Sequence, residues 1–238
     1  MAVNLRGVTT VLLAGTGSDD DYVYRAFSGA LHDAGAVLVT PAPDPNRLVA
    51  GYLAALDEAA RGEAPIAVGG VSIGAAVATA WALHHPRQAV AVLAALPAWS
   101  GEPGNAPAAL IARHSSAQLR ENGLAATIAE MQAGSPPWLA AELTRSWLAQ
   151  WPSLPDSIAE AAEFVAPTVE ELTALTVPMG VVAAVDDPVH PADVAVEWVA
   201  AAQHAALRTV TLDEMGADPA VLGAACLAAL WDAGPSLR

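Results

Sequence analysis

The chain has 238 residues, of which 54% are hydrophobic, and this length and composition fit a single α/β domain that carries an insertion. Its 25 acidic residues outnumber its 10 basic residues and give a formal net charge of −15, which argues against polyphosphate, nucleic-acid or anionic-membrane partners. The one cysteine, Cys226, lies on the apolar stripe of the last predicted helix, so it is expected in the core and no disulfide can form within the chain.

The N-terminal apolar run, residues 8–15, leads into Gly17, Ser18 and three aspartates. This pattern is typical of a strand followed by a loop, and it lacks the charged segment with which a signal peptide begins. No run approaches the roughly 18 apolar residues that a membrane span needs. We therefore expect a cytoplasmic protein with no nucleic-acid and no membrane partner, and self-association into a homo-oligomer remains open.

Apolar runs of strand length alternate with helical patterns through the first hundred residues. Strands are expected at 10–14, 36–40, 66–70 and 89–96, with helices from the acidic residues 19–21 to about 33, around 48–56, and from the third strand to about 84. Continuous apolar runs are typical of parallel strands that are covered on both faces. Four such alternations predict a doubly wound parallel sheet.

The pattern changes over residues 97–177, where no strand is expected and amphipathic helices are separated by glycine- and proline-rich breaks. One of these helices would carry Trp147 and Trp151 on a single stripe. Such a stripe more often packs against other helices than binds a ligand, but the helices of a lid must also cover the site beneath them. We therefore expect Trp99, Trp138, Trp147 and Trp151 mostly within or beneath this lid, with some of them around an apolar pocket. After it come strands at 179–185 and 207–212 and helices at about 192–203 and from 219 onward.

The third strand ends in Gly-Val-Ser-Ile-Gly, residues 70–74, and runs straight into a helix-forming sequence. In that context the motif is typical of a nucleophile elbow, which holds Ser72 in a strained turn at the tip of the strand. Gly70 and Gly74 supply the small residues that such a turn needs two positions before and after the serine. The alternative is a glycine-rich turn with an incidental serine, and the flanking strand and helix favour the elbow.

With the elbow, the helical insertion and six strands, the chain resembles the α/β-hydrolase family over nearly its whole length. The resemblance implies an α/β-hydrolase fold with a mostly parallel sheet of about six strands. Residues 1–96 and 178–238 would form the core, and residues 97–177 would form the helical lid. Only about eight residues precede the first strand, so the N-terminal hairpin usual in the family would be missing or vestigial.

The resemblance also assigns the nucleophile and two donors to an oxyanion hole. Ser72 matches the nucleophile, and the N–H of Ile73 matches the first donor. The sequence Ala-Gly-Thr-Gly at residues 14–17 matches the family's His-Gly-x-Gly turn with alanine in place of histidine, and so puts Gly15 at the substrate and the N–H of Thr16 at the second donor. Trp99, at the start of the lid, is expected to bind substrate.

The segment 184–191, directly after a strand, looks like the family's acid loop, in which the carboxylate lies four residues before a proline. That spacing selects Asp187. The alternative is that Asp186 and Asp187 only cap the following turn, but the strand, the loop and the order of serine before aspartate favour the catalytic role.

The family's histidine is missing from its usual place, because the predicted loop after the last strand, residues 213–219, contains none. His190 is the one histidine that the topology places near Ser72, and a surface-loop histidine is an equally good reading of it. His114 could swing in from the lid. A desolvated carboxylate at Asp213, Glu214 or Asp218 is the remaining alternative for the base.

These residues predict a serine hydrolase that cleaves an ester, thioester or similar bond of a small, uncharged or apolar acyl substrate, with no metal or cofactor. Ser72 would attack, Thr16 and Ile73 would hold the oxyanion, and Asp187 and His190 would complete a non-standard triad. A second hypothesis is a degenerate member that keeps the pocket to bind a ligand or a partner. A third is non-hydrolytic chemistry in the same pocket.

Overall fold

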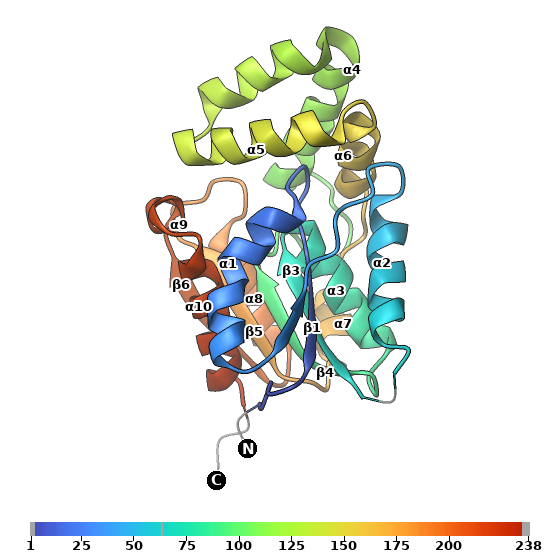
Figure 1. Cartoon of the computed structure of the whole chain (residues 1–238), viewed down its shortest axis with the longest axis vertical. Coiled ribbons are helices and arrows are strands. Elements are labelled where there is room, and N and C mark those ends of the chain that lie inside the picture. Colours follow the sequence, from blue (N-terminus) through green and yellow to red (C-terminus); the bar gives the residue numbers. More distant parts are fainter. Residues whose placement is uncertain (1–2, 63, 235–238) are drawn as a thin grey trace.

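The computed structural model describes residues 3–62 and 64–234. The described residues form a single twisted sheet between two layers of helices, with further helices above one end of the sheet (Figure 1). The strands run parallel in the order β2-β1-β3-β4-β5-β6. Their bounds are Thr9–Leu13 for β1, Val37–Val39 for β2, Ile66–Val71 for β3, Ala89–Ala95 for β4, Met179–Ala184 for β5 and Ala205–Val210 for β6.

The helices cover both faces of this sheet. One face packs against α2 (Leu48–Ala59), α3 (Ile73–His84) and α8 (Ala192–Ala201), and the other against α1 (Asp20–Asp33) and α10 (Ala220–Asp232). Every residue of β3 and β5 is buried, which explains why these strands are continuous apolar runs rather than alternating ones. The doubly wound parallel sheet expected from the sequence is confirmed, and residues 3–8 form no strand ahead of β1.

The chain between β4 and β5 is helical: α4 (Pro107–Gly134), α5 (Pro137–Gln150), α6 (Leu154–Ala162) and α7 (Val169–Leu172). We call α4, α5 and α6 the covering helices, because they lie above the carboxyl ends of the strands (Figure 1). Gly123, with φ +77°, kinks α4 and lets its two halves pack differently. The expectation that all of 97–177 covers that edge is too broad, since α7 packs beside α8 instead.

Two boundaries differ from the sequence expectation. Trp151 lies beyond the end of α5, so it does not continue the stripe of Trp147. The predicted loop after the last strand is a helix, α9 (Leu212–Ala217), and β6 ends two residues early. Thr211 and Glu214 start α9 with a capping box, a local signal that was present in the sequence. None of the helices in the described ranges is both long and apolar enough to cross a membrane.

Candidate active site

Ser72 lies at the turn between β3 and α3 with φ 54° and ψ −116°, and the residue is 8% exposed. A backbone conformation of this kind costs about 1–3 kcal/mol and persists only where packing enforces it. Here the packing is that of β1, because a Cβ atom at Gly70 or at Gly74 would collide with the carbonyl oxygen of Leu13. The Ser72 N–H also donates to the Ala95 carbonyl at 2.9 Å. Close contact between strands therefore fixes the serine at the carboxyl edge of the sheet.

A short turn follows β1 and lies against this serine. We call residues 15–18 the glycine turn; it is closed by the Ser18 N–H, which donates to the Gly15 carbonyl at 3.0 Å. A Cβ atom built on Gly15 would lie 3.6 Å from the Ser72 Cβ. The N–H groups of Thr16 and Ile73 donate to no other described residue. Both N–H groups are therefore unused; Ile73 directly follows the serine, and Thr16 directly follows Gly15, which packs against the serine.

The loop after β5 brings a carboxylate and an imidazole to the same serine. The Nε2 atom of His190 lies 3.0 Å from the Ser72 Oγ, and its Nδ1 atom lies 2.7 Å from the Asp187 Oδ2. The tautomer consistent with both contacts has Nδ1–H donating to Asp187, so that Nε2 accepts from the serine hydroxyl. The three side chains form one continuous hydrogen-bonded chain.

Asp187 also organises its own loop, because its Oδ1 accepts hydrogen bonds from the N–H groups of Val189 at 2.7 Å and His190 at 3.3 Å. Burial pushes the pKa of the Asp187 carboxyl upward, but the hydrogen bond and charge of His190 and the two backbone N–H groups outweigh burial and hold the pKa below its ordinary value. Asp187 therefore caps the turn and contacts the histidine at once, so the two readings of this residue are compatible.

The segment after β6 supplies apolar side chains in place of a base. Leu212 and Met215 line the cavity beside Ser72. Glu214 is exposed and closes the capping box of α9, and the exposed Asp218 accepts from the Ala220 N–H. Asp213 is exposed as well. None of these three carboxylates lines the cavity, so the carboxylate alternative finds no support in the geometry.

The remaining candidate base, His114, lies on α4 in the wall of the same cavity. Its Nε2 lies 2.9 Å from the Glu130 Oε1, and the side chain is more than half exposed. This ring is paired with a carboxylate on its own helix, whereas the ring of His190 contacts the serine. Among the described residues, no three His, Cys, Asp or Glu side chains cluster as metal ligands would.

A cavity of about 500 Å³ lies between Ser72 and the covering helices. Trp99, Trp138 and Trp147 are in its wall, whereas Trp151 is 41% exposed and outside it. Three of the four tryptophans line the cavity, where some of them were expected, and Trp151 does not, because the chain leaves the helix before that residue. The carboxylates of the wall are Glu130, Glu142 and Asp187, and the described wall residues include no lysine or arginine. The wall is mainly indole rings and aliphatic groups, and each of its carboxylates contacts an imidazole or an arginine.

Solved structures share this architecture. A protein described as the non-heme bromoperoxidase BpoC from Mycobacterium tuberculosis H37Rv superposes with a TM-score of 0.68 and 18% identity over 99% of this chain and 98% of its own. The enol-lactonase from Burkholderia xenovorans LB400 superposes with a TM-score of 0.66 and 18% identity, over 87% of this chain and 84% of its own. A thermophilic esterase from Thermogutta terrifontis superposes with a TM-score of 0.60 and 18% identity, over 87% of this chain and 81% of its own. The expected α/β-hydrolase fold is thereby confirmed.

The family is shown by the sequence itself. Residues 41–216 match the hydrolase family model described as serine aminopeptidase, S33. The match spans well over half of the chain and includes Ser72, Asp187 and His190, so the chain belongs to this family. Membership indicates a hydrolase. No curated protein matches the sequence.

Proposed function

We propose that the chain is a serine hydrolase that cleaves an ester or thioester bond of a small, uncharged or apolar acyl substrate. The observation that carries this proposal is the chain of contacts from the Ser72 Oγ to His190 at 3.0 Å and on to Asp187 at 2.7 Å. A serine hydroxyl at its free pKa is a poor nucleophile, and an imidazole at this distance can accept its proton. The carboxylate fixes the tautomer and stabilises the imidazolium that forms.

In the first half of the reaction the Ser72 Oγ bonds to the acyl carbon while His190 takes the hydroxyl proton. The N–H groups of Thr16 and Ile73 receive the negative charge that develops on the carbonyl oxygen, and removing one such donor typically costs about 3 kcal/mol. Collapse of this intermediate breaks the bond to the leaving group, which takes the proton from His190. Water then attacks the acyl-enzyme by the same steps and releases the acid.

The cavity wall supports the substrate class. Indole and aliphatic side chains offer burial to an apolar group, and we assign Trp99 to its binding. The described wall residues include no lysine or arginine, which disfavours a negatively charged substrate. A volume of about 500 Å³ admits a small ligand. The ester-type bond is favoured because an esterase and an enol-lactonase are among the structures with this fold.

The test is covalent labelling of Ser72 by a fluorophosphonate, together with hydrolysis of p-nitrophenyl butyrate. We expect labelling and turnover in the natural chain and loss of both in Ser72→Ala. Ser28→Ala, which removes a half-buried serine of α1 outside the cavity wall, is the matched control and should behave like the natural chain. Labelling that persists in Ser72→Ala would contradict the proposal. A natural chain that binds the ester but never turns it over would favour the degenerate binding protein.

A further inference from the structure

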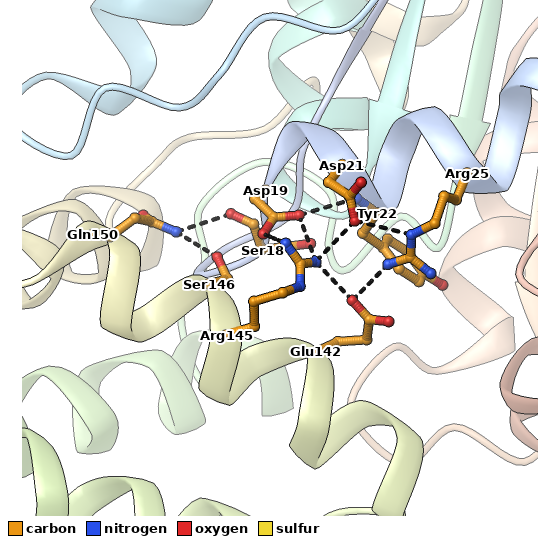
Figure 2. A network of polar contacts seen from close by, with 9 residues as sticks. All are labelled: Ser18, Asp19, Asp21, Tyr22, Arg25, Glu142, Arg145, Ser146 and Gln150. Carbon is orange, nitrogen blue, oxygen red and sulfur yellow. Dashed lines mark hydrogen bonds and ion pairs between the residues drawn. The ribbon is translucent and has the colours of Figure 1, made fainter.

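Three contacts from α5 converge on residues 17–19, directly after the proposed oxyanion donor Thr16. The Trp147 indole packs on Gly17 so closely that a Cβ atom there would lie 2.6 Å from its Nε1. The Gln150 side chain donates to the Ser18 carbonyl at 3.0 Å, and Arg145 forms an ion pair with Asp19 at 2.6 Å (Figure 2). One helix thus makes a packing contact, a hydrogen bond and an ion pair with three consecutive residues.

The polar contacts of this interface form a network of ion pairs rather than a single ion pair. Glu142 accepts from Arg145 at 2.8 Å and from Arg25 at 2.7 Å, and Arg25 in turn contacts Asp21 at 2.9 Å, as Figure 2 shows. Asp19 belongs to both sides, because its Oδ1 also caps α1 by accepting from the Tyr22 N–H at 3.0 Å. The network therefore joins a covering helix to the start of α1, which is where the glycine turn ends.

The amide of Gln150 is held in place before it reaches the turn. Its Nε2 donates to the Ser146 Oγ at 2.7 Å as well as to the Ser18 carbonyl, and both side chains are buried. A buried amide with both protons used has one orientation, so this contact fixes the position of the Ser18 peptide.

The glycine turn needs such support. On its N-terminal side the Tyr52 hydroxyl donates to the Ala14 carbonyl at 3.0 Å from α2. Beyond that anchor come Gly15 and Gly17, the latter with φ +68°, and glycine allows several backbone conformations of similar energy. A misplacement of about 1 Å at a donor costs far more in rate than in binding. The contacts of α5 supply the anchor on the C-terminal side.

The interface between α5 and the core also holds buried polar atoms that have no hydrogen-bond partner among the described residues. Of the four buried side-chain polar atoms without a hydrogen-bond partner among the described residues, three lie here: the Tyr22 hydroxyl and the indole Nε1 atoms of Trp138 and Trp147. A buried donor without a partner weakens the packing that encloses it. The ordering of the turn by α5 therefore depends on the contacts of Gln150 and Arg145 rather than on these three atoms.

We propose that α5 positions the oxyanion donor of Thr16, with Arg145 and Gln150 as positioning residues that act through Ser18 and Asp19. This proposal rests on the serine-hydrolase function proposed above. If the proposal holds, α5 both encloses the substrate and orders the oxyanion donor, because the catalytic geometry is complete only while α5 is docked on the core.

The test uses Arg145→Gln and Gln150→Ala, singly and together, with Arg120→Gln as the matched control. Arg120 is another half-exposed arginine of the covering helices, and its ion pair with Asp156 lies away from the turn. We expect kcat for p-nitrophenyl butyrate to fall about tenfold in the double variant with KM changed less than threefold, because transition-state contacts are lost. Arg145→Lys, which keeps the charge opposite Asp19, should recover part of the loss.

A second readout does not depend on turnover. The Ser18 amide closes the glycine turn on the Gly15 carbonyl, so its hydrogen exchange, followed by NMR, reports whether the turn is ordered. We expect exchange about tenfold faster in the double variant and unchanged in Arg120→Gln. Unchanged Ser18 exchange in a folded double variant would overturn the proposal, as would a rise in KM at constant kcat. A natural chain without esterase activity would contradict the proposed function, while Ser18 exchange would still decide whether α5 orders the turn.

Discussion

The segments that follow β5 and β6 leave the sheet side by side, and they bring different kinds of side chain to the cavity. β5 and β6 are neighbouring parallel strands in which Ala184 pairs with Val210, so the chain leaves both strands at the same edge. The loop after β5 carries Asp187 and His190, whereas the segment after β6 presents apolar side chains to the cavity. Because the two strand ends are adjacent, both segments reach the cavity beside Ser72, and the imidazole that contacts the serine comes from the first of them.

The two segments are also tied to each other. The Asp186 carboxylate accepts from the Leu212 N–H at 2.8 Å, while the next residue, Asp187, faces the histidine. Consecutive aspartates thus divide two tasks, of which one joins the segments and the other organises the proposed triad. Pro188 and Pro191 flank the region and restrict the backbone that holds His190 in place.

The largest effect is expected from His190→Ala, which removes the proposed base from the β5 loop. We expect kcat for a short acyl ester to fall by about 10⁶-fold, because no other imidazole contacts the serine in the described structure. Steady-state kinetics with folded protein checks this. His32→Ala, which removes an exposed histidine near the end of α1 outside the cavity wall, is the control and should stay within about threefold. Full activity in His190→Ala would place the base elsewhere.

A smaller loss is expected from Asp187→Asn, since the carboxamide keeps the shape of the side chain but can stabilise the wrong tautomer of His190. In triads of this kind the acid contributes less than the base, so we expect kcat to fall about 10⁴-fold. Asp186→Asn is the matched control in the neighbouring position and should change kcat less than threefold. Equal losses in both variants would show that the loop, rather than the contact with His190, is what matters.

The fold could be predicted from the sequence because its signals are local. Buried strands read as apolar runs, and the glycines around Ser72 mark the turn that β1 forces on the chain. The contact of His190 with Ser72 could be expected from topology, since both residues follow strands at one edge. It could not be distinguished from a surface histidine, because the direction of a loop side chain depends on contacts made elsewhere.

Other features lay outside what local patterns reveal. Arg145 and Asp19 are 126 positions apart, and nothing in either segment indicates that a covering helix contacts the glycine turn. The capping box of Thr211 and Glu214 was a readable signal for α9, but the comparison with the family favoured a loop there. Trp151 matched a helical stripe that ended one residue too soon.

The apolar segment after β6 gives the third prediction. Met215 is buried in the cavity wall, so Met215→Ala removes packing from both the core and the substrate site. We expect the free energy of unfolding to fall by about 2 kcal/mol and KM for an apolar ester to rise several-fold while kcat holds. Urea unfolding and kinetics measure the two effects. A drop in kcat comparable to that of His190→Ala would mean that this segment takes part in the chemistry after all.

The smallest effect is a pH dependence of stability that originates in the β5 loop. The pKa of Asp187 is lower in the folded chain than its ordinary value of about 3.9, so near that pH the unfolded state binds more protons than the folded state. The contribution of this carboxylate is therefore complete above about pH 5 and is lost as the pH falls through its folded pKa. Its size should stay below about 1 kcal/mol, because water reaches part of the loop.

Urea unfolding between pH 3 and 7 measures this term as the difference between the natural chain and Asp187→Asn. The asparagine cannot ionise, so the difference should shrink toward acid pH. His190→Ala should also reduce the pH dependence of stability. The hydrogen bond and charge of His190 are the chief causes that lower the pKa of Asp187, and they oppose the effect of burial, which raises it. If the free energy of unfolding has the same slope against pH in all three proteins, His190 does not lower the pKa of Asp187 in solution. The β5 loop would then not differ from the β6 segment in its electrostatics.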